Sequence, residues 1–302
     1  MRHEAPHSFA GAARHEAMAA WRLCAPTLAL MLLLLVLPSL AVVGLSLTDA
    51  ELGSSDWNFL GLDAYRDLLG DRNFQRAFRN TAVYVGLVAP ASVVLGLALA
   101  LLIEAGTAGR AFFRSVFFLP VVSLIVAMAT VWQYLMHPTI GPLNLLLGKL
   151  GLPAVNWLGT SGTVLWGLAI IGIWQAVGFN MVLYLAGLTS IDRTLYQAAE
   201  IDGAQSAWER FRLVTWPMLS PMTLFVITIT VINSVKVFET VAALTQGGPA
   251  RASEVLLWSI YQEGFVYLHI GTASAMAVVF VAVLLVLILV QTRVLEQRVQ
   301  YQ

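Results

Sequence analysis

The sequence contains 302 residues, of which 59% are hydrophobic and only 11% are charged, and its mean hydropathy is +0.78. These values exclude an ordinary soluble globular protein, in which about 25% of residues are charged. The formal net charge is zero, with 17 basic and 17 acidic residues, and no basic stripe indicates a nucleic-acid partner. The single cysteine, Cys24, excludes an internal disulfide and a cysteine-based metal cage, so we expect no metal site.

Long apolar runs predict membrane-spanning helices. A helix needs about 20 apolar residues to cross about 30 Å of hydrocarbon, because its backbone polar groups must be satisfied within the segment. Six stretches qualify: Leu23–Leu47, Thr81–Ile103, Ser115–Met136, Thr163–Leu188, Leu213–Val235 and Ile270–Thr292. The first is longer than a signal-peptide core and no small-x-small cleavage motif follows it directly, so we expect it to be retained. The expected fold class is all-α, a polytopic membrane protein with six transmembrane helices.

The chain divides into a short tail and one membrane domain. Residues 1–22 are expected to form a cytoplasmic N-terminal tail, and residues 23–302 a transmembrane domain. With both termini cytoplasmic, the inner segments carry more lysine and arginine than the outer ones, which favours that orientation. Apolar residues at helical spacing in Thr48–Asn80 predict short amphipathic helices on the outer side, and the loops after the third and fifth spans predict further short helices there.

A polar loop, Tyr196–Pro221, interrupts the apolar spans on the inner side. Helix-forming residues run into Asp202-Gly203, where glycine supplies the positive φ that ends a helix. A second helix is expected to begin near Ala204, and helical spacing places three of its residues on one face: Ala204, Trp208 and Phe211. Pro217 and Pro221 follow, where we expect the chain to bend into the fifth span.

The residue order of this loop is that of a known family. "QAAEIDGA", followed by Phe211, Val214, Trp216-Pro217 and Pro221, closely resembles the EAA loop of the inner-membrane permease subunits of binding-protein-dependent ABC importers. That loop has Glu-Ala-Ala, then Asp-Gly-Ala, a phenylalanine, an aliphatic residue and Leu-Pro. Two positions depart from it, since Gln197 replaces the glutamate and Trp216 the leucine. Gln197 carries no charge, so a salt bridge from that position to the ATPase is not expected.

Other stretches extend the resemblance over most of the chain from Leu23 onward. "FFRSVFFLP", "IWQAVGFNMVLYLAGLTSI" and "KVFETVAALTQGGPARASEVLLWSIYQEGF" are similar to the carbohydrate-uptake branch, which includes maltose-type and glycerol-3-phosphate-type permeases. The resemblance implies a cytoplasmic coupling helix that docks into a groove on an ATPase. The ATPase-coupling residues that it implies are Gln197, Ala198, Ala199, Asp202, Gly203, Ala204, Trp208, Phe211 and Pro217.

The resemblance also implies partners and a place in the cell. The chain would be a permease subunit in the bacterial or archaeal cytoplasmic membrane, and with a second permease subunit it would form the path for a sugar, polyol or glycerol phosphate. Two ATP-binding subunits and an external solute-binding protein would complete the importer. ATP and Mg²⁺ would be bound by the ATPase, leaving this chain without a cofactor or enzymatic activity.

The residues themselves argue against a nucleotide site in this chain. The nearest approach to a P-loop is "GPLNLLLGKL", in which Gly141 is too far from Gly148-Lys149 and Leu150 replaces the serine or threonine that would hold Mg²⁺. ATP hydrolysis is therefore expected in partner chains. An intramembrane enzyme is also disfavoured, because His137 and His269 both lie near predicted outer ends and neither has a partner motif such as H-E-x-x-H or G-x-S-x-G.

A proton-coupled secondary transporter is the alternative function. Lys236 and Glu239 are the only candidates for a proton relay, since ionised side chains within a membrane span usually mark function. Their i,i+3 spacing equally allows a structural ion pair. The sequence leaves both interpretations open.

Polar and aromatic residues within the spans mark a candidate substrate path. A sugar needs hydrogen bonds to its hydroxyl groups and aromatic faces against its ring. Candidates are Gln133, Trp174, Gln175, Asn180, Asn233, Lys236, Glu239 and Thr240. Asn233, Lys236 and Thr240 share one face if the fifth helix continues through them. For any one candidate, a helix–helix hydrogen bond or a place in an interfacial aromatic belt is the competing interpretation.

Overall fold

The computed structural model describes residues 9–54, 56–106 and 109–296. Within these ranges the chain is helical, and strand-like pairing is limited to an isolated bridge between Thr48 and Phe59. The α-helices are α1 (Phe9–Met31), α2 (Leu37–Leu45), α3 (Asp63–Gly70), α4 (Arg72–Ala105), α5 (Arg110–Val122), α6 (Ile125–Leu135), α7 (Pro142–Lys149), α8 (Val164–Thr189), α9 (Arg193–Ile201), α10 (Ala207–Arg210), α11 (Trp216–Val235), α12 (Glu239–Leu244), α13 (Leu256–Tyr261) and α14 (Ile270–Glu296). π-helical turns occupy Leu32–Val36, Phe211–Thr215 and Gln262–Val266.

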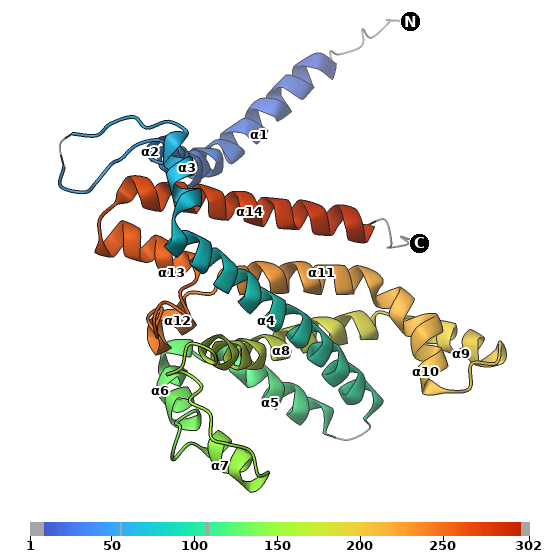
Figure 1. Cartoon of the computed structure of the whole chain (residues 1–302). Helices are drawn as coiled ribbons and strands as arrows, with labels where there is room; N and C mark the ends of the chain where they lie inside the picture. The colour runs from blue at the N-terminus through green and yellow to red at the C-terminus, as the bar shows by residue number, and fades with distance from the viewer. Residues whose placement is uncertain (1–8, 55, 107–108, 297–302) are drawn as a thin grey trace, which may run out of the picture.

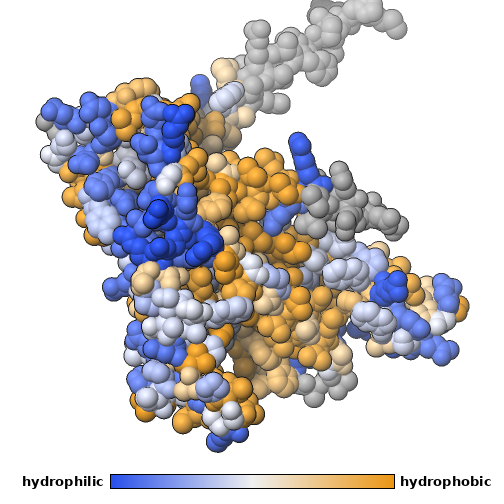
Figure 2. Space-filling model, in the orientation of Figure 1, coloured by the Kyte–Doolittle hydropathy of each residue, from blue (hydrophilic) through white to orange (hydrophobic). Residues whose placement is uncertain are grey.

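The described helices include five that are long and apolar enough to cross a membrane, and a sixth candidate is a bent pair. The five segments are Ala20–Leu45, Arg72–Ala105, Val164–Thr189, Ala207–Leu244 and Ile270–Gln291. The first joins part of α1 to α2 through a π turn, and the fourth runs from α10 to the end of α12. Apolar surface gathers over the middle of these helices, with hydrophilic residues toward the two ends (Figure 2). This distribution is that of a protein whose central band lies in hydrocarbon.

The third predicted span, Ser115–Met136, corresponds to two helices, α5 and α6, joined by a sharp bend. α5 ends at Val122, the next two residues are extended, and α6 leaves at 103°. The 13 residues of α5 rise only about 20 Å, less than the roughly 30 Å of hydrocarbon. The cause is tertiary packing, since the buried side chains of Ile125 and Trp132 hold α6 against Ile171 of α8.

α8 is the centre of the bundle, and α4, α5 and α11 pack around it (Figure 1). Half of its apolar window is buried, whereas none of the window of the first span is. Small residues permit the close contacts. A Cβ on Gly96 of α4 would lie 2.7 Å from the Asn180 Cβ, and one on Gly178 of α8 would collide with the Phe117 carbonyl oxygen of α5.

The helix ends define two sides of the molecule. α1 begins and α14 ends toward the side that holds α9 and α10, while α3, α12 and α13 lie toward the opposite side (Figure 1). We call these the inner and outer ends. The short helices expected in the outer loops correspond to α3, α7 and α13.

Two expected boundaries shift. The predicted tail 1–22 is helical from Phe9 onward, and residues 1–8 lie outside the described residues. Residues 72–80, expected to belong to separate outer helices, form the start of α4. Asp71 caps α4 by accepting hydrogen bonds from the backbone N–H groups of Asn73 and Phe74, at 3.2 and 3.0 Å, so the helix begins there.

Candidate functional site

The inner loop is a compact helix-turn-helix. α9 starts at an Asp192 cap, whose carboxylate accepts from the Thr194 backbone N–H at 2.9 Å, and this hydrogen bond lowers the pKa of Asp192. The turn that follows has Gly203 at φ 98°, a backbone conformation that glycine adopts without steric cost. The Ala204 N–H donates to the Ala199 carbonyl at 2.9 Å and closes the turn. The expected end of the first helix at Asp202-Gly203 is therefore present.

The second helix starts later than expected, at Ala207 instead of near Ala204. Ser206 and Glu209 form a capping box, in which the Glu209 carboxylate accepts from the Ser206 backbone N–H at 2.9 Å and the Ser206 hydroxyl accepts from the Glu209 N–H at 3.1 Å. The reciprocal pair satisfies two backbone donors and so fixes the start. Ala204 is consequently buried in the turn, apart from the face that holds Trp208.

The loop presents an aromatic surface away from the bundle. Trp208 is 68% exposed and its ring stacks on Phe211 at 5.5 Å, which in turn lies 6.0 Å from Trp216. The other predicted coupling residues surround it. Gln197, Ala198, Asp202, Gly203 and Pro217 are exposed, and Ala199 and Phe211 are half-buried.

Side-chain contacts make this surface rigid. Arg210 Nη1 lies 2.5 Å from Glu200 Oε1 and joins α10 to α9. The Tyr196 and Thr215 hydroxyls lie 3.0 Å apart and join α9 to the π-helical turn. That turn connects α10 to α11, so the chain stays helical through Pro217. The expected bend lies at this π turn, where Figure 1 shows the axis changing direction.

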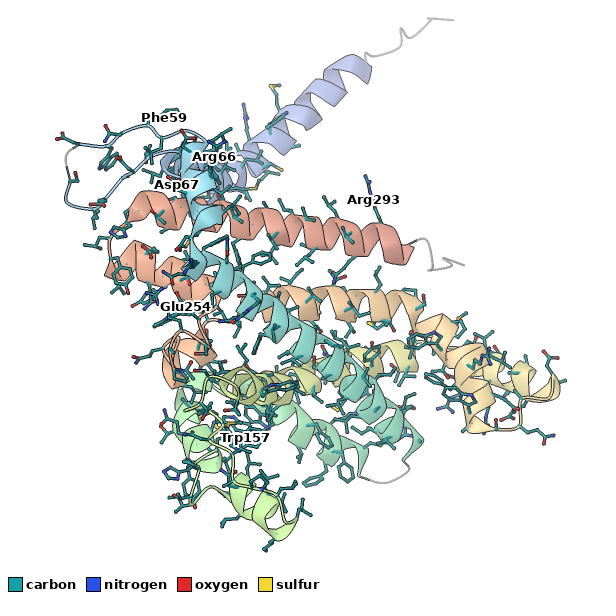
Figure 3. All side chains as sticks on the ribbon, viewed as in Figure 1. Phe59, Arg66, Asp67, Trp157, Glu254 and Arg293 are labelled. Atoms are coloured by element: carbon teal, nitrogen blue, oxygen red, sulfur yellow. The ribbon has the colours of Figure 1, made fainter. Side chains whose placement is uncertain are left out.

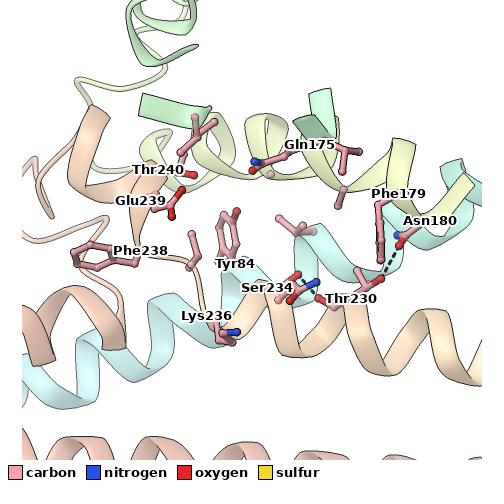
Figure 4. Close-up of a pocket in the computed structure, with 17 residues that line it drawn as sticks. Tyr84, Gln175, Phe179, Asn180, Thr230, Ser234, Lys236, Phe238, Glu239 and Thr240 are labelled. Atoms are coloured by element: carbon pink, nitrogen blue, oxygen red, sulfur yellow. Dashed lines mark hydrogen bonds between the residues drawn. The ribbon is translucent and has the colours of Figure 1, made fainter. Parts of the chain in front are cut away.

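The second feature is a cavity of about 490 Å³ between α4, α8 and α11, with residues from α5 and from the starts of α6 and α12 completing its wall. Six of the eight predicted substrate-path residues line it: Gln175, Asn180, Asn233, Lys236, Glu239 and Thr240 (Figure 4). They come from α8, from α11, from its C-cap Lys236 and from the first two residues of α12. Polar groups from distant parts of the chain thus meet at one concave site.

Helix α11 ends before the predicted polar stripe does. It terminates at Val235, with Lys236 as its C-cap, and α12 begins at Glu239. The face expected for Asn233, Lys236 and Thr240 on one continuous helix is therefore wrong, although all three reach the cavity. The break places successive residues, from Lys236 to Thr240, on the cavity wall.

The ion pair considered for Lys236 and Glu239 is absent from the described part of the chain. Both side chains are exposed and line the cavity, and they lie apart in Figure 4. The i,i+3 geometry that would join them needs an uninterrupted helix, and the helix is interrupted between them. Each charge is thus presented separately to whatever occupies the cavity.

Asn180 is held by neighbouring helices. Its Oδ1 accepts from the Thr230 hydroxyl of α11 at 2.9 Å, and its Nδ2 donates to the Ser92 hydroxyl of α4 at 3.3 Å. Asn180 is 1% exposed, so interhelical hydrogen bonding accounts for its amide. Of the two interpretations of this residue, the structural one fits the geometry.

Gln133 and Trp174 lie outside the cavity wall. The Trp174 ring packs edge-on against Trp132 at 5.3 Å in the cluster that fixes α6 to α8. Gln133 is exposed on α6. Gln133 was predicted on the third span, which is bent by 103° between α5 and α6, whereas Trp174 lies on α8 as predicted but packs in the cluster with Trp132.

Three aromatic residues of the cavity wall were missed: Tyr84, Phe179 and Phe238. Tyr84 is buried, and its hydroxyl occupies the space where a Cβ of Gly172 would lie. Tyr84 lies near the start of the predicted span Thr81–Ile103, so the sequence marked it only as a residue typical of a membrane interface. The two phenylalanines carried no such signal.

The segment tested as a P-loop forms a helix. In "GPLNLLLGKL" the residues from Pro142 to Lys149 make α7, so their backbone N–H groups serve helical hydrogen bonds and do not form a phosphate cradle. Asn144 anchors this helix through its amide, which donates to the Val155 carbonyl and accepts from the Val155 N–H, both at 2.9 Å.

Known proteins share both the sequence and the fold. A family model for the inner membrane component of binding-protein-dependent transport systems matches residues 92–301. YurN of Bacillus subtilis, a probable ABC transporter permease, is 34% identical over 87% of this chain and 91% of its own. AmyD of Thermoanaerobacterium thermosulfurigenes, a probable permease for starch degradation products, is 30% identical over 92% and 94%. UgpA of Agrobacterium fabrum, an sn-glycerol-3-phosphate permease, is 30% identical over 81% and 83%.

A solved structure has the same arrangement of helices. A chain in the crystal structure of a bacterial alginate ABC transporter, in complex with an alginate pentasaccharide-bound periplasmic protein, superimposes with a TM-score of 0.82. The two chains are 23% identical, and the match covers 95% of this chain and 96% of that chain. The family match spans the inner loop, α5 to α14 and the cavity wall apart from Tyr84 and Val88. The chain belongs to the family of inner membrane components of binding-protein-dependent transport systems and is a multi-pass protein of the inner membrane.

Proposed function

We propose that this chain is the permease subunit of an ATP-driven importer and that it moves a sugar, polyol or glycerol phosphate inward. The observation that carries the proposal is the helical continuity between the exposed Trp208 surface and the cavity. α10, the π turn and α11 run without interruption from Ala207 to Val235. About 40 Å of helix therefore joins Trp208 to Asn233, and a push at one end moves the other as a rigid body.

The energy source is a partner chain in this proposal. One of two ATP-binding subunits docks on the surface formed by Trp208 and Phe211. These subunits bind ATP and Mg²⁺, while this chain carries no cofactor and catalyses no reaction. The exposed, rigid aromatic pair supports docking, because buried aromatic anchors dominate the energetics of protein interfaces. The uncharged Gln197 lies on this surface and contributes hydrogen bonds instead of a salt bridge.

A second permease subunit and a solute-binding protein complete the importer. None of the apolar window of the first span is buried within this chain, which leaves α1 and α2 available to a neighbouring membrane subunit as well as to lipid. The external solute-binding protein delivers the solute at the outer end. A periplasmic protein accompanies the alginate transporter to which this fold is similar.

The cavity suits a polyhydroxylated solute. Gln175, Asn233 and Glu239 supply hydrogen-bonding groups and Phe179 an aromatic face, the combination that sugars need. Lys236 adds a cation for a phosphate or carboxylate group. Relatives are named for starch degradation products and for sn-glycerol-3-phosphate, and both solutes carry several hydroxyl groups.

The test is uptake by the assembled complex in proteoliposomes, with Gly203→Asp as the variant. Gly203 is at φ 98° with open space around it, so a side chain strains the turn without a clash. Solute-stimulated ATP hydrolysis should be lost while membrane insertion stays normal. Gly151→Asp is the matched control, since Gly151 also has positive φ, at 74°, and open space, but lies at the outer end.

The same uptake assay distinguishes an ATP-driven importer from the alternative, a proton-coupled secondary transporter. Uptake that needs ATP and survives a proton uncoupler supports an ATP-driven importer. Uptake that persists without the ATP-binding subunits and collapses with the uncoupler supports a proton-coupled transporter and contradicts the proposal. Unaltered ATP hydrolysis by Gly203→Asp contradicts the docking role of the loop.

A further inference from the structure

A second, smaller cavity lies at the outer end, in the loop between α12 and α13. We call it the outer pocket and define it by six of its lining residues: Gln246, Arg251, Glu254, Trp258, Gln262 and Tyr267. Its volume is about 220 Å³, below the roughly 300 Å³ at which pockets for drug-sized ligands begin. It therefore suits one small ring or polyol, and an oligosaccharide would not fit within it.

The loop that forms the outer pocket is held rigidly. The amide of buried Asn80 on α4 donates to the Glu254 and Arg251 carbonyls at 2.9 and 3.2 Å. The Thr81 hydroxyl accepts from the Leu256 N–H at 2.9 Å. Figure 3 shows Glu254 where this loop meets α4. Gln246 and Arg251, both at positive φ of 50° and 60°, hold a conformation that side-chain-bearing residues rarely adopt. The pocket groups are thus positioned before any ligand binds.

The charges in the outer pocket balance. Glu254 is 4% exposed, and its Oε2 lies 3.7 Å from Arg251 Nε. Its other oxygen accepts from the Ser259 hydroxyl at 2.9 Å. Within the described chain Oε2 makes the ion pair but no hydrogen bond, and it remains a strong acceptor. The carboxylate repels an anionic ligand and the guanidinium a cationic one, so the lining favours a neutral ligand with hydroxyl groups.

An aromatic wall joins the outer pocket to the main cavity. The Trp258 ring lies 6.0 Å from Phe238 and 5.5 Å from Tyr261. Phe238 lines the main cavity and Trp258 lines the outer pocket. The two cavities are therefore separated by one layer of side chains, which places the outer pocket beside the route into the bundle.

We propose that the outer pocket is a separate binding subsite for a single neutral sugar ring, occupied before the solute enters the main cavity. Arg251, Gln246 and Gln262 donate to ring hydroxyls, Glu254 Oε2 accepts from one, and Tyr267, half exposed, offers an aromatic face. The proposal rests on the transport function proposed above, and it adds a site outside the membrane-spanning helices.

Binding to the full chain in lipid nanodiscs tests the subsite directly. The probes are methyl α-D-glucopyranoside and methyl α-D-galactopyranoside, with acetate as an anionic probe, and the readout is saturation-transfer difference NMR. At least one glycoside should bind and acetate should not. Gln262→Ala should weaken glycoside binding about fivefold, the typical effect of losing one hydrogen bond, and Tyr267→Ala should weaken it at least as much.

Matched control variants show whether the NMR signal of the bound glycoside comes from the outer pocket. Phe265→Ala removes a 75% exposed ring from the same π-helical turn but outside the pocket, and it should leave binding unchanged. Trp57→Ala removes an exposed ring from the segment between α2 and α3, outside the pocket, and should also leave binding unchanged. Thermal unfolding of each variant separates lost binding from lost folding, and Gln262→Ala still decides the question if Tyr267→Ala proves unstable.

Three results overturn the subsite: neither glycoside binds the wild type, acetate binds more tightly than the glycosides, or Gln262→Ala and Tyr267→Ala bind like Phe265→Ala. These outcomes are independent of the transport assay, because binding is measured without ATP or partners. Failure of ATP-driven uptake would contradict the importer proposal and leave the binding result standing.

Discussion

Trp208 provides the sharpest test of where the ATP-binding subunit docks on this chain. Its side chain is 68% exposed and its ring contact is the stack with Phe211 at 5.5 Å. Removal of an exposed side chain usually changes stability by no more than about 0.5 kcal/mol. The Trp208→Ala variant should therefore insert and unfold like the wild type, and any large effect must come from a partner.

The expected loss of binding free energy at the docking surface is much larger. A tryptophan at the centre of an interface typically contributes about 2 kcal/mol or more on truncation to alanine, which raises a dissociation constant about 30-fold. The assay is biolayer interferometry between the purified ATP-binding subunit and the chain in nanodiscs, followed by ATP hydrolysis in proteoliposomes. Both affinity and solute-stimulated hydrolysis should fall.

Trp57→Ala is the matched control, because Trp57 is 57% exposed and lies in the outer segment between α2 and α3. It should bind the ATP-binding subunit like the wild type. Equal affinities for Trp208→Ala and the wild type would refute the docking surface. So would an equal loss in both variants, since a general disturbance of the chain would then explain the result.

Three further predictions concern packing, charge and pH. Gly178→Ala should lower the free energy of unfolding by about 1–3 kcal/mol through overpacking against the α5 backbone. Gly86→Ala, with nothing within 4 Å of the added Cβ, should leave thermal unfolding unchanged. Lys236→Gln and Glu239→Gln should change transport KM additively, with a coupling energy under about 0.5 kcal/mol, and strong coupling in a double-mutant cycle would indicate an ion pair. The hydrogen bond from the backbone N–H of Ser206 lowers the pKa of Glu209. The contribution of the Glu209 carboxylate to the stability of α10 should therefore be complete above about pH 4.3 and fade as pH falls through the lowered pKa. Hydrogen exchange in α10 should then lose protection in acid, and Glu209→Gln should lack that pH dependence.

The parts of the structure that follow from local rules could be predicted from the sequence. The end of α9 at Asp202-Gly203 depends on a glycine at positive φ, which is a property of one residue. Lys236 and Glu239 could be named as candidates for the substrate path because ionised groups in an apolar span usually mark function, with an ion pair as the open alternative. Both predictions required only residue type and position in the chain.

The breaks in the helices could not be predicted in this way. Residues on both sides of Ser123 and Leu124 are apolar, so hydropathy reads one continuous span. What bends the chain is the burial of Trp132 and Ile125 against other helices, a contact between segments far apart in sequence. The end of α11 at Val235 likewise has no glycine or proline to mark it. The ion pair considered for Lys236 and Glu239 needed α11 to continue through both residues.

Continuous and broken helices occur where the proposed mechanism needs each. The stretch that transmits the push in this mechanism, Ala207 to Val235, stays helical through two prolines, although its axis changes direction at the π turn. A barrier that opens must contain segments that move independently. The breaks after Val122 and Val235 both adjoin the outer end of the main cavity. In the proposed mechanism, Glu239 and Thr240 of α12 move relative to Lys236 at the end of α11, so that opening of the cavity changes how Lys236 and Glu239 are placed around the solute.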